Sequence, residues 1–177
     1  DVPVPLGVTI PVPAVDYQPA LTMAAELFLP AGSGPFPVVI YSHGRAGKPE
    51  ERSGLKFAIP RGHARFWMRE GFAVVAPVRP GYGVDGGADR ERSGARLDAN
   101  GACSGALRVV AAGEASATAV RAAVDWTRVQ PWAVRDRLLL VGQSAGGVAT
   151  VLAASHAPPG VVGLVYLFYL NPFICTP

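Results

Sequence analysis

Apolar residues in this chain gather in short continuous runs separated by polar, glycine-rich or proline-rich stretches. Residues 37–42 and 72–78 are rich in β-branched side chains and do not alternate with polar ones. This pattern is typical of strands that are buried on both faces of a sheet. Residues 138–141 and 161–170 repeat it. The four runs therefore predict the central strands of one sheet.

Helical spacing appears between these runs. Residues 114–129 place apolar side chains three or four positions apart, and residues 61–70 and 146–155 also predict helices. Buried strands that alternate with helices are typical of an α/β fold, in which helices cover both faces of a mostly parallel sheet. We expect residues 1–177 to form a single domain.

The remaining segments predict edges and loops. Residues 22–29 predict a strand, and residues 2–12 predict at best an edge strand, because their prolines cannot donate to a strand ladder. Residues 43–55 predict a polar loop. Residues 85–113, rich in Gly, Asp and Arg, predict a long surface loop. This loop starts at the carboxyl end of a strand, where ligands bind in α/β folds, so we expect it to border the pocket.

Composition narrows the classes of function. The chain has 177 residues, 50% of them hydrophobic and 16% charged, which favours a globular core. The net charge is +3, and the basic residues are scattered among acidic ones, which argues against a nucleic-acid partner. No apolar run approaches the roughly 18 residues of a membrane span. Oligomeric state is not indicated.

Cysteine usage and the chain start say little about location. Cys103 and Cys175 lack the spacing of metal ligands and cannot form a disulfide framework, which favours two free thiols over one bridge. The chain begins at Asp1 with no start methionine and no signal-peptide pattern. This start fits a processed protein that is secreted or periplasmic, and it also fits an incomplete record.

The sharpest motif is Gly142-Gln-Ser144-Ala-Gly146, a G-x-S-x-G between the strand at 138–141 and a helix. A nucleophilic serine needs a tight strand-to-helix turn, and small residues two positions on either side let the backbone pass. The helix then directs its positive N-terminal end at a developing oxyanion. The alternative interpretation is a glycine-rich turn with a bystander serine.

A second motif, Ser42-His43-Gly44-Arg45, follows the strand at 37–42. Acyl transfer needs two backbone N–H donors directed at one oxygen. Ala145, after the serine, and Arg45, after His-Gly, are the candidate donors. The Arg45 guanidinium is not needed for this role, and we expect it to bind an acidic substrate or Glu50. We expect His43 to shape this loop and not to act as a base.

These two motifs, with the Phe-Ala-Val-Val-Ala-Pro strand that ends in Arg-Pro-Gly-Tyr-Gly, resemble the α/β-hydrolase superfamily over residues 22–163. Within it the chain is similar to the branch of dienelactone hydrolases and serine peptidases. The resemblance implies a Ser–His–acid triad, a covalent acyl-enzyme and no metal or organic cofactor. Ser144 matches the nucleophile of these enzymes, and Arg45 and Ala145 match the oxyanion donors.

The resemblance also implies an acid and then a histidine after the serine. No Asp or Glu follows Asp136, and the only later histidine is His156. Residues 171–177 are too few for another parallel strand, which needs a crossover of a dozen or more residues. The expectation is a fold without its last strands, with an unpaired sheet edge. Truncation or a frame shift near Val165 and a divergent terminus are both open.

Two histidines are candidates for the base. His156 lies twelve residues after Ser144, about 18 Å along a helix, and is expected to cap that helix. His63 is the better candidate, with Asp85 or Asp89 to orient it, and its alternative is a solvated loop histidine.

The sequence therefore predicts a serine hydrolase of small carboxylic esters that acts through Ser144 and an acyl-enzyme. The alternative is a catalytically incomplete fragment or a non-catalytic binding module with this fold. A peptidase or amidase comes next, since the motif does not report the leaving group.

Overall fold

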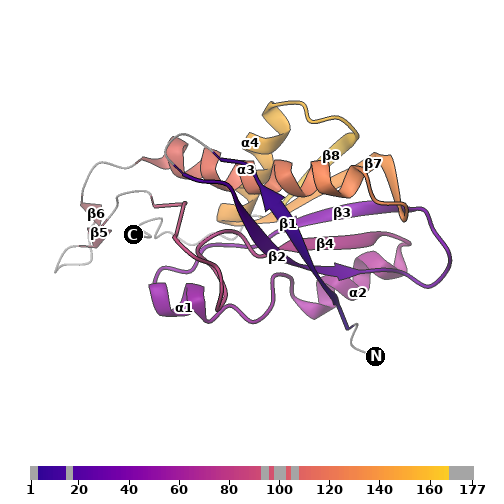
Figure 1. Ribbon diagram of the computed structural model, residues 1–177, viewed down its shortest axis with the longest axis horizontal. Helices are drawn as coiled ribbons and strands as arrows, with labels where there is room; N and C mark the ends of the chain where they lie inside the picture. The colour runs from indigo at the N-terminus through magenta and orange to yellow at the C-terminus, as the bar shows by residue number, and fades with distance from the viewer. Residues whose placement is uncertain (1–3, 15–17, 93–95, 98–102, 105–107, 168–177) are drawn as a thin grey trace.

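A six-stranded sheet forms the centre of the molecule (Figure 1). The computed structural model describes residues 4–14, 18–92, 96–97, 103–104 and 108–167. The strands of the sheet are β1 (Leu6–Val12), β2 (Leu21–Phe28), β3 (Phe36–Ser42), β4 (Ala73–Pro77), β7 (Ala133–Gln143) and β8 (Val161–Leu167). Their order is β1-β2-β4-β3-β7-β8.

The sheet is mostly parallel, as the sequence predicts. Strands β4, β3, β7 and β8 run parallel, whereas β1 and β2 add an antiparallel pair at one edge. Val39 of β3 pairs with Val74 of β4 on one side and with Leu139 of β7 on the other. The strand before the His-Gly motif thus lies directly beside the strand before the G-x-S-x-G motif.

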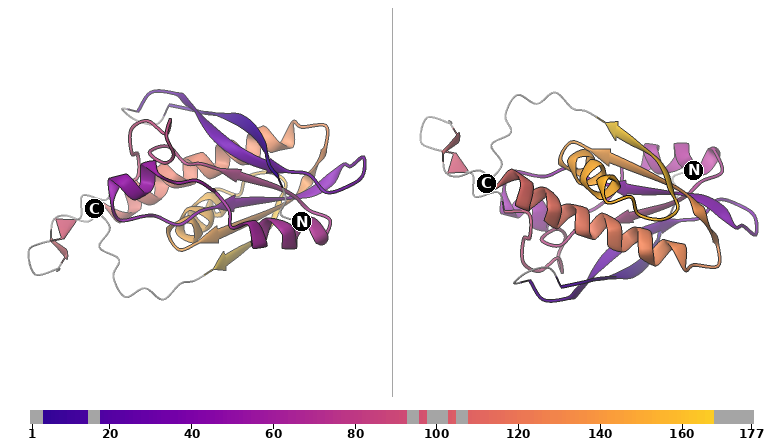
Figure 2. Two further views of the ribbon diagram at one scale, coloured as in Figure 1. Left: turned by 90° about the horizontal axis from the view of Figure 1, so that it is seen from below. Right: turned by 90° about the horizontal axis from the view of Figure 1, so that it is seen from above.

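Helices cover both faces of the sheet, which confirms the α/β fold class. The helices are α1 (Pro49–Ser53), α2 (Arg61–Arg69), α3 (Val109–Arg128) and α4 (Ala145–Ser155). Figure 2 shows α1 and α2 on one side and α3 and α4 on the other. Val38 and Ile40 belong to the core under α3 and α4, while Val39 and Tyr41 belong to the core under α2. Burial on both faces explains why these runs show no polar alternation.

The structure departs from the predictions in four places. Helix α3 begins at Val109 and not at residue 114, and β7 begins at Ala133 and not at residue 138. Helix α1 lies within the predicted polar loop, where Pro49 in the first turn followed by Glu50 and Glu51 is a helix-start signal. Two short strands, β5 (Arg96–Leu97) and β6 (Cys103–Ser104), pair within the predicted long loop.

Among the described strands, β8 lies at the edge of the sheet next to β7. Val162, Leu164 and Tyr166 on one of its faces are exposed. Residues 168–177, with the predicted end of this strand and Cys175, lie outside the described residues, as does the Cys103 side chain. No helix in the described part of the chain is long and apolar enough to cross a membrane.

Candidate active site

Ser144 forms a one-residue turn between the end of β7 and the start of α4. Its backbone has φ 54° and ψ −121°, a conformation that side-chain-bearing residues rarely adopt. The backbone N–H of Ser144 donates to the carbonyl of Leu167 at 3.1 Å, and its own carbonyl accepts from Gly147 at 2.8 Å. This is the sharp turn that the motif predicts.

The two outer glycines of the motif are required by backbone contact. A methyl group on Gly142 would lie 2.2 Å from the carbonyl oxygen of Gly146. One on Gly146 would lie 2.1 Å from the carbonyl oxygen of Ser42 at the end of β3. No side chain fits at such distances, so the spacing in G-x-S-x-G follows from the packing of α4 onto β7 and β3.

The loop after β3 lies beside Ser144. A methyl group on Gly44 would be 3.6 Å from the Cβ of Ser144 and 3.5 Å from the carbonyl oxygen of Gln143. The sheet register produces this contact, because Ser42 pairs with Gly142 and both strands end at the same edge. The structure thus brings together the two motifs that contain Arg45 and Ser144.

Arg79, fully buried after β4, holds this loop from behind. Its Nη1 donates to the Ser42 hydroxyl at 2.8 Å and to the His43 carbonyl at 2.5 Å, and its Nη2 donates to the Gly44 carbonyl at 3.4 Å. Glu91 accepts from Nε at 2.5 Å and from Nη2 at 3.3 Å. Burial alone would lower the pKa of Arg79, but the Glu91 carboxylate outweighs it and raises that pKa, so the guanidinium stays charged.

A second arginine holds the next part of the loop. Arg52 Nη1 donates to the carbonyls of Ala46 and Gly47, both at 3.0 Å. In a trans peptide the carbonyl and the following N–H point to opposite sides. Because Arg79 draws in the Gly44 carbonyl, the N–H of Arg45 points away from the buried arginine. This orientation favours Arg45 N–H as a donor to a bound group.

The Arg45 side chain is not left for a substrate or Glu50, contrary to our expectation. Its Nη1 and Nη2 donate to the two carboxylate oxygens of Asp89, at 3.1 and 2.7 Å. Tyr82 accepts from Nη1 at 3.3 Å, and Glu91 lies 3.5 Å away. Burial would raise the pKa of Asp89, but the Arg45 guanidinium outweighs it and lowers that pKa. Asp89 is therefore an anchor for Arg45.

His43 shapes the loop, as expected. Its Nε2 accepts the backbone N–H of Arg79 at 3.2 Å, so the proton resides on Nδ1, which donates to the Gly44 carbonyl at 2.7 Å. The ring packs edge-on against Tyr82, with centroids 4.4 Å apart. Burial and the neighbouring Arg79 charge hold the pKa of His43 well below 6.5, so the ring is neutral. Both nitrogens are occupied.

His63 and His156 also have other partners. His63 Nδ1 lies 3.5 Å from the hydroxyl of Tyr41, and Asp89 is turned away to Arg45, so the predicted Asp89–His63 pair is wrong. Asp85, the other predicted partner, is exposed.

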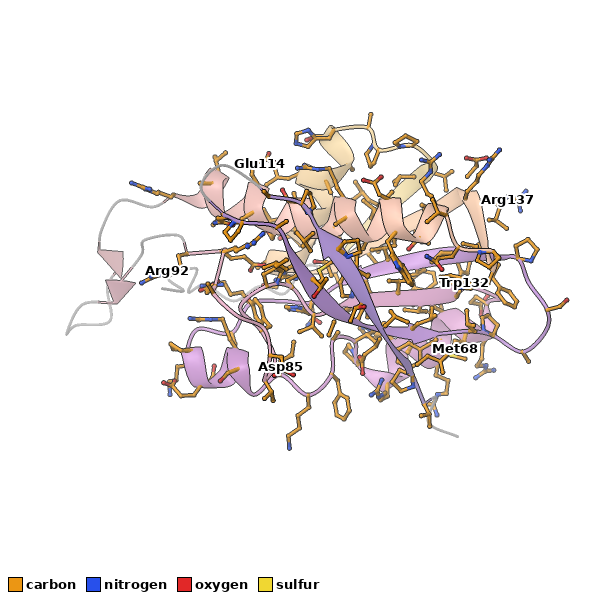
Figure 3. The ribbon with its side chains drawn as sticks, viewed as in Figure 1. Met68, Asp85, Arg92, Glu114, Trp132 and Arg137 are labelled. Carbon is orange, nitrogen blue, oxygen red and sulfur yellow. The ribbon has the colours of Figure 1, made fainter. Side chains whose placement is uncertain are left out.

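His156 is the C-terminal cap residue of α4 by position. However, its Nε2 lies 3.2 Å from a carboxylate oxygen of Glu114 and not at the last carbonyls of α4. Figure 3 shows Glu114 on α3. Within the described part of the chain, no histidine contacts Ser144 Oγ.

A hollow of about 530 Å³ opens beside Ser144. Its lining consists of the loop after β3, an apolar wall and the end of β7: His43, Gly44, Arg45, Ala46, Leu55, Phe57, Ala58, Pro60, Gln143 and Ser144. The predicted long loop contributes no described residue to this lining, and supplies Asp89 and Glu91 behind it instead. The sequence did not predict the wall at residues 55–60, which lies between the predicted polar loop and the predicted helix at 61–70. No group of three potential metal ligands occurs among the described residues.

Comparison with known proteins supports the fold. The sequence matches no protein-family profile and no curated protein. The structure is similar to the dienelactone hydrolase of Anabaena variabilis (TM-score 0.60, 19% identity, 94% of this chain and 63% of that one). It is also similar to the α/β hydrolase GrgF of Penicillium sp. (TM-score 0.62, 20% identity, 91% of this chain and 45% of that one). A third similar structure is a dienelactone hydrolase-like promiscuous phosphotriesterase from metagenomic libraries (TM-score 0.55, 17% identity, 92% of this chain and 59% of that one).

The chain therefore has the α/β-hydrolase fold. It spans 63% of the length of the Anabaena enzyme and 45% of the Penicillium one. At these identities the similarity concerns the fold alone.

Replacing Arg79 tests how the loop is held. Arg79→Met leaves Glu91 buried without its main partner, and we expect a loss of about 3–5 kcal/mol in unfolding free energy. Glu91→Gln in the same background should recover part of that loss. Urea unfolding followed by tryptophan fluorescence measures both. Arg135→Met, which removes an exposed ion pair with Asp136, should change little; a loss of equal size in this control would contradict the assignment.

The neutral His43 predicts a pH dependence. Its folded pKa lies below the unfolded value of about 6.5, so only the unfolded chain takes up a proton as the pH falls below 6.5. Stability should therefore fall between pH 7.5 and 5.0, by about 2 kcal/mol from this group. In His43→Asn the unfolding free energy should change less between the two pH values, as measured by urea unfolding at each. The control is His63→Gln, at an exposed position, which should keep the pH dependence of the unmodified chain. A profile unchanged in His43→Asn would show that folding does not lower the pKa of His43.

Proposed function

We propose that this chain provides the nucleophile and the oxyanion donors of a serine hydrolase that acts on small carboxylic esters. The observation that supports this most directly is the position of Ser144. It sits in a strained turn at the wall of the hollow, against a loop whose carbonyls are drawn back by two arginines. No described side chain lies within hydrogen-bond distance of Ser144 Oγ, so the hydroxyl is open to a ligand.

In the proposed reaction, Ser144 Oγ attacks the ester carbonyl carbon and gives up its proton. The carbonyl oxygen becomes an oxyanion, which accepts hydrogen bonds from the backbone N–H groups of Arg45 and Ala145. Collapse of this intermediate breaks the bond to the alcohol, which leaves as it takes up a proton. Water then attacks the acyl-serine, and the carboxylic acid departs as Ser144 recovers its proton.

The oxyanion donors are supported by two independent features. The hydrogen bonds to the Gly44 carbonyl turn the Arg45 N–H away from Arg79. Ala145 is the first residue of α4, so its N–H has no partner within the helix and lies at the positive end of the helix dipole. Both groups are fixed before any ligand binds, which is the condition for stabilising charge that develops only during reaction.

Proton transfer is the step that the described residues do not provide. A serine hydroxyl is a weak nucleophile until a base accepts its proton. His43, His63 and His156 are the only histidines in the chain, and their contacts lie elsewhere. This observation favours the second candidate function, a binding module that keeps the fold without turnover.

The choice of ester over amide rests on the hollow and on chemistry. Its apolar wall of Leu55, Phe57, Ala58 and Pro60 suits a small acyl or alkyl group. An ester releases an alkoxide, whereas cleavage of an amide without a proton donor would release the much more basic amide anion, so ester hydrolysis depends less on a proton donor. The similar structures bear the names of hydrolases, including dienelactone hydrolase and phosphotriesterase. Peptide or amide hydrolysis is therefore placed after ester hydrolysis.

A nitrophenyl ester assay tests the proposal. The chain and its Ser144→Ala variant should hydrolyse 4-nitrophenyl acetate at similar rates near background, because loss of a triad member typically costs about 10⁴-fold. Imidazole, added as a diffusible base, should then produce an increment that depends on Ser144. A fluorophosphonate probe in the same buffer should modify Ser144, as located by mass spectrometry.

Ser155→Ala, at the exposed end of the same helix, is the matched control and should behave like the unmodified chain. A fast rate abolished by Ser144→Ala would show that a base is already present, and His63→Ala would then be the next variant. Absence of both the imidazole increment and the fluorophosphonate adduct would reject Ser144 as the nucleophile and favour the binding module.

A further inference from the structure

The residue before Ser144 takes part in a small polar chain beneath the hollow. The Tyr41 hydroxyl donates to Gln143 Oε1 at 2.9 Å, and His63 Nδ1 lies 3.5 Å from the same hydroxyl. Tyr41 comes from β3, Gln143 from β7 and His63 from α2. Three elements therefore converge on one hydroxyl, next to the proposed nucleophile.

The direction of this hydrogen bond follows from Tyr41. The residue is fully buried, and burial raises the pKa of its hydroxyl to about 12, so the oxygen keeps its proton. A phenol has one proton to donate, and it is used on Gln143. Toward His63 the Tyr41 oxygen can therefore act only as an acceptor. The side chain of Gln143 is held with its oxygen facing the core.

A glutamine amide whose oxygen is fixed in this way has a fixed nitrogen. Gln143 Nε2 has two N–H donors, and neither has a partner among the described residues. The nitrogen is not one of the buried polar atoms that lack a partner, and the residue lines the hollow with Ser144. Its donors are thus accessible from the hollow.

We propose that Gln143 is a specificity-determining residue whose amide N–H groups, oriented by Tyr41, donate to a neutral oxygen acceptor in the substrate beside the ester group. The proposal rests on the proposed function in taking the hollow as the substrate pocket. It deepens that function by naming the substrate class: esters with an ether or carbonyl oxygen close to the reacting carbonyl.

A neutral acceptor fits the surroundings better than a carboxylate. The charged side chains next to the hollow are paired with one another, since Arg45 binds Asp89 on both oxygens and Arg52 lies 3.5 Å from the same carboxylate. The part of the lining formed by Leu55, Phe57, Ala58 and Pro60 is apolar. A carboxylate entering the hollow would lose hydration that this wall cannot replace, whereas an ether or carbonyl oxygen needs only one donor.

Ligand binding to the Ser144→Ala variant tests this without hydrolysis. Ethyl methoxyacetate and ethyl butanoate differ by one oxygen in place of one methylene, and monoethyl succinate presents a carboxylate. Each is titrated into ¹⁵N-labelled protein while side-chain amide signals are followed. The chain has three glutamines, Gln18, Gln130 and Gln143, so these signals are few. The Gln143 signal is assigned by its loss in a variant.

Ethyl methoxyacetate should bind about three- to tenfold more tightly than ethyl butanoate, the range expected of one net hydrogen bond, and should shift the Gln143 signal. Gln143→Glu and Gln143→Met, each in the Ser144→Ala background, should abolish the preference. Tyr41→Phe should weaken it, since the amide is then free to turn. The matched control is Gln130→Glu. In the unmodified chain the Gln130 amide donates to the Trp126 carbonyl and not to the hollow, so this variant should retain the preference for ethyl methoxyacetate.

Three results would overturn the proposal: equal affinities for the two neutral esters, a preference that survives in both Gln143 variants, or tightest binding of monoethyl succinate. Failure of the proposed function is recognised separately, because these titrations need no nucleophile. If the chain prefers the ether but Ser144 forms no fluorophosphonate adduct, the proposal for Gln143 stands and the proposed hydrolase activity is rejected.

Discussion

The buried ion pair between Arg79 and Glu91 is the interaction on which the site depends. A guanidinium with no exposed surface is costly unless every donor and the charge are satisfied. Here the Glu91 carboxylate supplies the opposite charge. The Ser42 hydroxyl and the carbonyls of His43 and Gly44 accept hydrogen bonds from the remaining N–H groups of Arg79. Because those carbonyls have turned inward to Arg79, the loop after β3 is fixed by hydrogen bonds, with the N–H of Arg45 directed away from Arg79.

The strained turn at Ser144 depends on the same arrangement. A positive φ at a serine persists only where the surroundings enforce it. Enforcement comes from backbone contacts that only glycine allows: Gly142 against α4, and Gly146 against the end of β3. The end of β3 is the segment that Arg79 holds through Ser42 and His43. The turn at Ser144 and the loop after β3 are therefore parts of one packed unit.

The sheet, its covering helices and the turn at Ser144 could be predicted from the sequence, because their signals are local: continuous apolar runs, helical spacing and glycine spacing. The partners of the charged side chains could not. Arg79 pairs with Glu91 across twelve residues of loop, and Arg45 pairs with Asp89, but Arg90 and Arg92 stand beside the same acids. Ion pairs between distant residues leave no periodic pattern in the sequence. Only the folded structure therefore shows which arginine binds which acid. Helix α1 had a local signal in Pro49 and its acids, which the polar composition around it obscured.

The polarity that a ligand meets in the hollow therefore comes from oriented dipoles more than from charged side chains. The guanidinium groups of Arg45, Arg52 and Arg79 hold the loop, and the groups that remain for a ligand are backbone N–H donors and the Gln143 amide. Fixed dipoles attract a neutral ester only weakly, yet they stabilise an oxyanion strongly because they need no reorganisation when charge appears. A site built in this way is better suited to a reaction in which charge develops than to the binding of a charged ligand. That difference is the physical reason to propose ester hydrolysis, ahead of the binding of an anion, for this chain.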